Sequence, residues 1–88
     1  MSWVCEFTKD AEEDLRKLPK PIQKRVVRVL TEMEGDPFRG DVKPLHGEAW
    51  KAAFRRRIGD YRLLFVVNHE SRIVSVLRIL PRSEKTYR

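Results

Sequence analysis

Four arginines lie close together in the segment FRRRIGDYRLLF, which covers residues 54–65. They are Arg55, Arg56, Arg57 and Arg62. A guanidinium group binds phosphate oxygens through paired hydrogen bonds, and it stabilises the negative charge that develops when a phosphodiester reacts. Arginine is a poor proton acceptor, because it stays protonated in proteins. The cluster therefore indicates binding of a phosphate-rich ligand, with electrostatic rather than acid–base assistance to any chemistry.

A tight turn in this segment decides which arginines share a face of the sheet. A two-residue turn at Gly59-Asp60, a favoured sequence for a type II′ turn, pairs Arg57 with Arg62. Side chains alternate between faces along a strand, so this register separates an apolar face from a basic one. The apolar face is expected to hold Trp50, Ala52, Phe54, Ile58, Tyr61, Leu63, Phe65 and Val67, with Arg56 as its one charge. The open face is expected to hold Lys51, Ala53, Arg55, Arg57, Arg62, Leu64 and Val66.

The pairing of Arg57 with Arg62 is unfavourable in the free protein. Like charges directly opposite each other on neighbouring strands cost up to about 1 kcal/mol, so a negatively charged ligand would offset the repulsion. The alternative is that these arginines form ion pairs with carboxylates such as Asp60 and Glu84 on a solvated face. The shortage of acidic residues near the cluster favours anion binding.

The open face is also expected to carry an apolar surface. Leu64 and Val66 should be exposed there, with Val74, Val76 and Leu80 as further candidates. Exposed apolar patches that are rimmed by charge often mark protein interfaces. The face is therefore expected to bind both a polyanion and a protein that covers it.

Residues suited to metal or acid–base chemistry are scarce. The two histidines, His46 and His69, fall in predicted loops away from the arginines, and Cys5 falls in a predicted strand as a small apolar side chain. No pair of carboxylates or cysteine–histidine cluster has the spacing of a metal site. The sequence therefore predicts neither a metal nor a cofactor. Arg78, in the last predicted strand, is expected to be a structural ion-pair partner.

The composition fits one small domain with a basic surface. The chain has 88 residues and a net charge of +6, and its 41% hydrophobic content is enough to form a core. Residues 1–42 carry 8 basic and 9 acidic side chains, whereas residues 43–88 carry 11 and 4, so the excess lies in the second half. Such an excess favours a polyanion or an acidic protein as partner. The lack of a long apolar run, a signal-peptide pattern or paired cysteines favours the cytoplasm and no membrane.

Hydrophobic periodicity predicts the elements that position these residues. Strands are expected at Ser2–Phe7, Ala49–Arg57, Tyr61–Asn68 and Arg72–Leu80, and helices at Lys9–Leu18 and Pro21–Glu34. The order β-α-α-β-β-β predicts an α+β fold, in which a helical hairpin packs on one face of a small, mainly antiparallel sheet. No linker or repeat interrupts the chain, so residues 1–88 are expected to form a single domain.

Several segments resemble the RelE/ParE superfamily of bacterial and archaeal toxins from toxin–antitoxin pairs. These segments are FTKDAEEDLRKLPKPIQKRV, VKPLHG, FRRRIGDYRLLF and VLRILPRSEKTYR. The resemblance implies a small curved sheet with two helices against it. RelE-like members enter the ribosomal A site and cut mRNA there, whereas ParE-like members poison DNA gyrase. The resemblance favours a ribosome-dependent mRNA endonuclease that inhibits translation, with a gyrase inhibitor or a catalytically weak binding protein as alternatives.

The resemblance also implies catalytic residues. Arg55 falls on a basic position of the second strand of the RelE-like members, and Arg62 on the arginine that follows the tyrosine of the third strand. Arg82 falls near an arginine that follows the last strand. Tyr87 resembles a C-terminal tyrosine, and it would serve as the base or stack on a nucleobase.

The implied site differs from the family pattern at one position. A second lysine position of the RelE-like members falls on Ala53, which has no functional group, and Lys51 and Arg57 are expected to bind RNA near it. The expected chemistry is metal-independent cleavage of mRNA. The expected partners are the mRNA, the ribosome and a cognate antitoxin that wraps the toxin in a hetero-oligomer.

Overall fold

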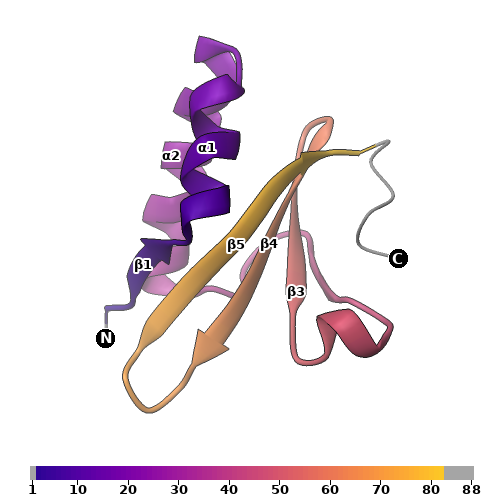
Figure 1. Cartoon of the computed structure of the whole chain (residues 1–88). Helices are drawn as coiled ribbons and strands as arrows, with labels where there is room; N and C mark the ends of the chain where they lie inside the picture. The colour runs from indigo at the N-terminus through magenta and orange to yellow at the C-terminus, as the bar shows by residue number, and fades with distance from the viewer. Residues whose placement is uncertain (1, 83–88) are drawn as a thin grey trace.

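The computed structural model describes residues 2–82, which form two helices and one five-stranded sheet (Figure 1). The elements follow the order β1 (Val4–Phe7), α1 (Lys9–Lys17), α2 (Lys20–Gly35), β2 (Val42–Pro44), the 3-10 helix η1 (Glu48–Trp50), β3 (Phe54–Ile58), β4 (Tyr61–Asn68) and β5 (Ile73–Pro81). The strands lie side by side in the order β1-β5-β4-β3-β2. Every neighbouring pair is antiparallel except β1 and β5, which run parallel. The predicted α+β fold is confirmed, with one additional strand, β2, that was not predicted.

Local sequence signals determine where each helix begins. Thr8 caps α1, because its side-chain oxygen accepts a hydrogen bond from the backbone N–H of Ala11. Pro21 lies in the first turn of α2, where its missing N–H does no harm. The ends of the helices differ from the predicted ones by at most one residue. Neither of these helices is long and apolar enough to cross a membrane.

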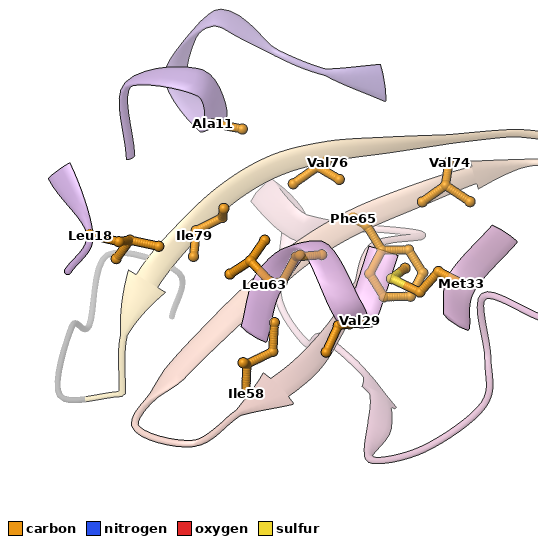
Figure 2. Close-up of a cluster of buried hydrophobic side chains, with 11 residues drawn as sticks. Ala11, Leu18, Val29, Met33, Ile58, Leu63, Phe65, Val74, Val76 and Ile79 are labelled. Carbon is orange, nitrogen blue, oxygen red and sulfur yellow. The ribbon is translucent and has the colours of Figure 1, made fainter. Parts of the chain in front are cut away.

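Both helices cover the same face of the sheet (Figure 1). Helix α1 packs on β5, and Figure 2 shows its Ala11 and Leu18 on the side of that strand. Val29 and Met33 of α2 lie beside the core side chains of β3 and β4 in the same view. The helix-side core consists of Ala11, Leu18, Val26, Val29, Met33, Ile58, Leu63, Phe65, Val74, Val76 and Ile79. Burial of these apolar side chains is the dominant favourable term in folding. The opposite face of the sheet, called the open face below, is covered by neither α1 nor α2.

The hairpin of β3 and β4 has the predicted register. Arg57 pairs with Arg62 across a two-residue turn, as predicted. The pairs that follow from this register also form, from Ile58 with Tyr61 at the turn to Phe54 with Phe65 at the far end of β3. Gly59 has a φ of +58°, whereas φ is not positive at Asp60, as a type II′ turn requires. The apolar side of the hairpin therefore meets the helices, and its basic side faces away from them.

The predicted strand Ala49–Arg57 is wrong in its first half. Strand β3 begins only at Phe54, and the 3-10 helix η1 and a turn occupy the residues before it. Ala52 has a φ of +67°, which lies outside the β region, and alanine is depleted in strands. Trp50 and Lys51 consequently lie outside β3, and neither takes its predicted place on a face of that strand.

A β-bulge in β5 interrupts the alternation of its side chains. Phe65 pairs with Val76, whereas the preceding residue of β4, Leu64, pairs with Arg78. Leu77 is therefore an extra residue in β5 with no counterpart in β4. From this residue onward the two faces of β5 exchange their odd and even positions.

The bulge corrects the prediction for the open face. Val74 and Val76 are fully buried in the helix-side core, so the expectation that they lie on the open face is wrong. Leu80, which follows the bulge, does lie on the open face, opposite Arg62. Simple alternation places all three residues on one face, because it contains no signal for the extra residue.

Helix α1 takes the place of a strand beside the second half of β5. Strand β1 pairs only with the first half of β5. Beyond it, the Thr8 hydroxyl donates to the carbonyl oxygen of Leu77 at 2.9 Å, and the N–H of Ile79 donates to the Asp14 carboxylate at 2.9 Å. Arg78 also binds Asp14, with 2.8 Å between Nε and Oδ2. Arg78 is thus the structural ion-pair partner that the sequence predicted.

The stability that the contacts of Asp14 give to the fold depends on pH. Burial alone would raise the pKa of its carboxyl, but the hydrogen bonds from Arg78 and from the N–H of Ile79, with the charge of Arg78, hold the pKa below its ordinary value of 3.8. The folded protein therefore binds a proton at Asp14 less readily than the unfolded chain does. The resulting stability is fully present above the ordinary pKa, and it is lost as the pH falls from there through the lowered pKa.

Replacing Asp14 by asparagine is expected to lower the free energy of unfolding by about 1–2 kcal/mol at pH 7, because a charged acceptor of three hydrogen bonds is lost at a partly exposed site. The measurement is urea unfolding at pH 7 and at pH 3. Glu13→Gln removes an exposed charge from the same helix and should cost less at pH 7. The cost of Asp14→Asn should shrink at pH 3, and an equal cost at both pH values would contradict this role of the carboxylate.

Candidate nucleic-acid interface

Charged side chains form two rows across the open face. Residues that pair across neighbouring strands point to the same face, so the register defines which side chains lie together. One row consists of Asp41, Arg57, Arg62 and Leu80, and the next consists of Lys43, Arg55, Leu64 and Arg78. Asp41 directly precedes β2, and its carbonyl oxygen accepts the N–H of Arg57 at 3.1 Å. The sheet thus gathers cations from β2, β3 and β4 on one surface.

Arg55 is held by Asp41. Its Nη1 donates to the Asp41 Oδ1 at 3.2 Å and to the backbone oxygen of the same residue at 3.3 Å. The Arg55 side chain is only 13% exposed, whereas that of Asp41 is 49% exposed. Lys43 lies opposite Arg55 on β2. A phosphate that binds Arg55 would therefore compete with the Asp41 carboxylate and would have a second cation beside it.

Lys43 and Asp41 are absent from the predicted site residues. Strand β2 has only three residues, so no alternating pattern can be recognised in it. The signal that could have found it is the pair Lys43-Pro44, because lysine and proline are typical of exposed edge strands. An edge strand inferred from that pair would have placed Lys43 beside β3.

The β3–β4 turn brings three of the predicted site arginines to one end of the sheet. Arg57 Nε lies 3.5 Å from the carbonyl oxygen of Gly59, and the N–H of Arg82 donates to the carbonyl oxygen of Asp60 at 2.7 Å. Arg62 is paired with Arg57 and is half-buried. Arg57 forms no ion pair with a carboxylate of the described residues. The structure therefore places Arg57, Arg62 and the backbone of Arg82 at the same end of the sheet.

Arg56 points to the helix side and belongs to the fold. Its Nη1 donates to the carbonyl oxygen of Arg39 at 2.7 Å, and its Nη2 lies 3.1 Å from the carboxylate of Glu32 in α2. The side chain is only 12% exposed. It passes so close to Gly40 that a Cβ there would lie 2.7 Å from the Arg56 Cζ. Arg56 thus fastens the loop before β2 to α2, and its predicted separation from the other three arginines is confirmed.

Other predicted site residues lie elsewhere. Lys51 is exposed in the turn that follows η1. Ala53 is 2% exposed, and its backbone is tied into the preceding loop by hydrogen bonds with Trp50 and Leu45. The position at which the RelE-like members are expected to carry a second lysine is therefore buried in this chain, where a lysine side chain could not reach a ligand without moving outwards. Tyr87 lies outside the described residues.

The expected exposed apolar patch is not present on the described part of the open face. Leu64 is fully buried and Leu80 is 5% exposed, although neither belongs to the helix-side core. Val66 is half-buried. The surface that the open face presents to solvent therefore includes its arginine and lysine side chains, whereas its two leucines contribute almost nothing to it.

The two histidines and the cysteine lie away from the arginines of the open face. His69 stacks on Phe38, with 6.1 Å between ring centroids, and meets Trp3 edge to face, whereas His46 is exposed in a loop. Burial raises the pKa of the Cys5 thiol, which lowers the fraction of reactive thiolate. Within residues 2–82, no group of three or more histidine, cysteine or acidic residues is placed to hold a metal.

Arg56→Gln and Arg57→Gln remove the same charge from adjacent residues, and they should have opposite consequences. Arg56→Gln is expected to lower the free energy of unfolding by about 1.5–3 kcal/mol, because it breaks charge-assisted hydrogen bonds of a nearly buried side chain. Arg57→Gln should leave stability unchanged or raise it by up to about 1 kcal/mol, because it removes the repulsion with Arg62. Urea unfolding measures both, and equal losses would contradict the conclusion that Arg56 stabilises the fold whereas Arg57 does not.

The sequence and the fold match known toxins. A family model described as the ParE toxin of the type II toxin–antitoxin system parDE matches residues 5–86. Toxin RelG of Mycobacterium tuberculosis is 35% identical over 85 residues, which are 96% of this chain and 95% of RelG. The toxin–antitoxin complex RelBE2 of the same organism contains a chain with 35% identity and a TM-score of 0.82, and the match covers 93% of this chain and 100% of that one.

Two further solved structures share the fold. The RelE–RelB complex of Pyrococcus horikoshii OT3 contains a chain with 27% identity and a TM-score of 0.81, covering 97% of this chain and 100% of that one. The isolated RelE toxin of E. coli is 21% identical with a TM-score of 0.78, and the match covers 97% of this chain and 89% of RelE. The match of the family model to nearly the whole chain, together with RelG, decides the family. The chain belongs to the RelE/ParE superfamily of toxins from type II toxin–antitoxin systems.

Proposed function

We propose that this toxin cleaves mRNA at the ribosome and thereby inhibits translation. The observation that carries the proposal is the open face, where Lys43, Arg55, Arg57 and Arg62 share a surface with a single carboxylate, Asp41, among the residues of β2–β4 and the residue before them. Such an excess of cations on neighbouring strands is unfavourable without an anion. Guanidinium groups match phosphate oxygens in geometry as well as in charge.

The proposed reaction is an attack within the RNA. The ribose 2′-hydroxyl attacks the adjacent phosphorus and the bond to the 5′ oxygen of the next nucleotide breaks, which leaves a 2′,3′-cyclic phosphate and a 5′-hydroxyl. A base must take the proton of the 2′-hydroxyl, and the leaving oxygen must gain one. Arg55 and Arg62 are proposed to bind the phosphate and stabilise the extra negative charge of the phosphorane. Arg82 is proposed to assist them, and Tyr87 is proposed as the base.

A site of this kind gains from a scaffold that orients its substrate. Arginines supply charge stabilisation, but they do not move protons at neutral pH. Much of the rate must then come from holding the 2′-hydroxyl in line with the leaving oxygen. An mRNA that is fixed in the ribosome would have this orientation, and Lys51 and Arg57 are proposed to bind its neighbouring phosphates.

A cognate antitoxin is the proposed protein partner in the cytoplasm. The M. tuberculosis and P. horikoshii relatives were solved as toxin–antitoxin complexes. An antitoxin segment that places carboxylates over Arg55 and Arg62 would occupy the positions of the RNA phosphates. It would inhibit the toxin by competition for the same guanidinium groups, within a hetero-oligomer of both chains.

Inhibition of DNA gyrase is the second candidate function. The family model that matches the chain is described as the ParE toxin, and the position of a second family lysine is occupied by the buried Ala53. Both observations fit a toxin that binds its target without cutting RNA. A RelE-fold protein with weak catalysis that acts only by binding is the third.

The purified protein is expected to cut mRNA on programmed ribosomes. Arg62→Ala should lower the single-turnover cleavage rate by about 100-fold or more, because a donor to the phosphorane is lost, and Tyr87→Phe should lower it because the proposed base is lost. Arg39→Ala, which removes an exposed cation from the loop before β2, is the matched control. Primer extension on the mRNA measures cleavage, and growth after induction measures toxicity.

The same experiments separate the three candidates. The endonuclease proposal is wrong if the wild-type protein does not cut mRNA on ribosomes while Arg62→Ala and Tyr87→Phe stay fully toxic. Loss of DNA supercoiling by gyrase, at toxin concentrations that spare translation, would establish the second candidate instead. Harmless expression without an antitoxin would support the third.

A further inference from the structure

A second basic surface lies on the helices, on the other side of the sheet from the open face. Residues 15–31 contain six basic residues and no acidic residue. They are Arg16, Lys17, Lys20, Lys24, Arg25 and Arg28, and all of them are exposed. None forms an ion pair with a carboxylate of residues 2–82. The net charge of residues 1–42 does not reveal this surface, because the nine acidic residues of that half offset its eight basic ones.

Three of these cations form a row along α2. Lys20, Lys24 and Arg28 follow one another at intervals of four residues, which places them on one side of the helix with a rise of about 6 Å between neighbours. The buried stripe of Val26 and Met33 lies on the other side. Like charges at this spacing destabilise a helix by about 0.2–0.5 kcal/mol per pair. An external anion would offset that cost.

The helical surface connects with the open face around the β3–β4 turn. A Cβ built on Gly59 would lie 2.6 Å from Nη1 of Arg25, so the Arg25 guanidinium lies against the turn. Arg57 Nε and the N–H of Arg82 approach the same turn through the carbonyl oxygens of Gly59 and Asp60. Cations therefore follow one another from α2, past the turn, to the rows of the open face.

The composition of this surface favours nucleic acid over a protein ligand. Lysine is depleted in the centres of protein interfaces, and the only large apolar side chain exposed on α2 is Val27. Interfaces with nucleic acid are much more positively charged. Residues 8–37 contain no aromatic residue, so this surface lacks the stacking platforms with which proteins bind unpaired bases. What it offers is a row of charges for phosphates.

We propose that the exposed cations of α2, Lys20, Lys24, Arg25 and Arg28, bind the phosphate backbone of a nucleic-acid double helix. These cations lie on the helix side of the sheet, whereas the proposed cleavage site lies on the open face. The two surfaces meet at the β3–β4 turn. The helical surface would hold the toxin against a structured nucleic acid while the open face receives a single strand. Binding there requires no cleavage, so it does not depend on the proposed chemistry.

The test compares two double variants with the same change in charge. Lys24→Gln with Arg28→Gln alters the row on α2, and Lys9→Gln with Arg39→Gln removes two exposed cations elsewhere. Fluorescence anisotropy with a 20-base-pair RNA duplex and a DNA duplex of the same length measures affinity at several salt concentrations. The α2 variant should bind at least about tenfold more weakly, and its slope of log affinity against log salt should shrink by about 2. The control variant should retain the wild-type slope.

Two other outcomes would overturn the proposal. Equal losses in both double variants would show a general effect of net charge. A wild-type protein that binds a polyglutamate peptide through Lys24 and Arg28, but neither duplex, would identify an acidic protein as the ligand. Where the predicted loss is seen, tighter binding to the RNA or to the DNA duplex identifies which nucleic acid supplies the phosphates. The absence of mRNA cleavage would leave the result standing, because the readout is binding alone.

Discussion

The two-residue turn at Gly59-Asp60 is the constraint on which the open face depends. It pairs Arg57 with Arg62, and a slip of one residue would turn the whole basic row towards the helices. Gly59 suits this position because its φ is positive, and a Cβ there would also require the Arg25 guanidinium, which lies against the turn, to move aside. The same local geometry therefore sets the register of the central hairpin, the composition of the helix-side core and the position of every candidate ligand group on β3 and β4.

The fold could be predicted where the controlling interactions are local. The stripes of α1 and α2, the turn residues and the alternation of β3 and β4 are all properties of short segments. The bulge at Leu77 is different, because its backbone is satisfied by the Thr8 hydroxyl, more than sixty residues away in the sequence. Strand β2 is too short to show a period, and the positive φ of Ala52 belongs to a turn that the hydrogen bond from the Ala53 N–H to the Trp50 carbonyl oxygen closes. A long-range hydrogen bond, a three-residue strand and a turn without glycine all leave no trace in local periodicity.

The candidate site likewise has features that local sequence predicts and features that depend on distant residues. Alternation along β3 separated Arg56 from Arg55 and Arg57, and the structure gives the reason, since Arg56 is committed to Glu32 and Arg39. It could not indicate that Asp41 holds Arg55, because that contact comes from the residue before an unpredicted strand. Sequence alone also left the burial of Ala53 unknown. The chemistry of a residue can be read from its type, but its availability depends on neighbours that the fold supplies.

The arrangement of carboxylates explains how one small fold can be stable and still carry so large an excess of positive charge. Asp14 and Glu32 bind Arg78 and Arg56, which hold α1 to β5 and the loop before β2 to α2. These pairs lie at the edges and on the helix side of the sheet. On the open face, Asp41 is the only carboxylate in the rows of paired residues, and it is half exposed. Arg78 ends one of the open-face rows at the β5 edge, but neither stabilising ion pair involves Lys43, Arg55, Arg57 or Arg62, the proposed ligand-binding cations. A polyanion bound to the open face, as proposed, would leave intact the contacts that hold the helices to the sheet, and it would compete with Asp41 for Arg55.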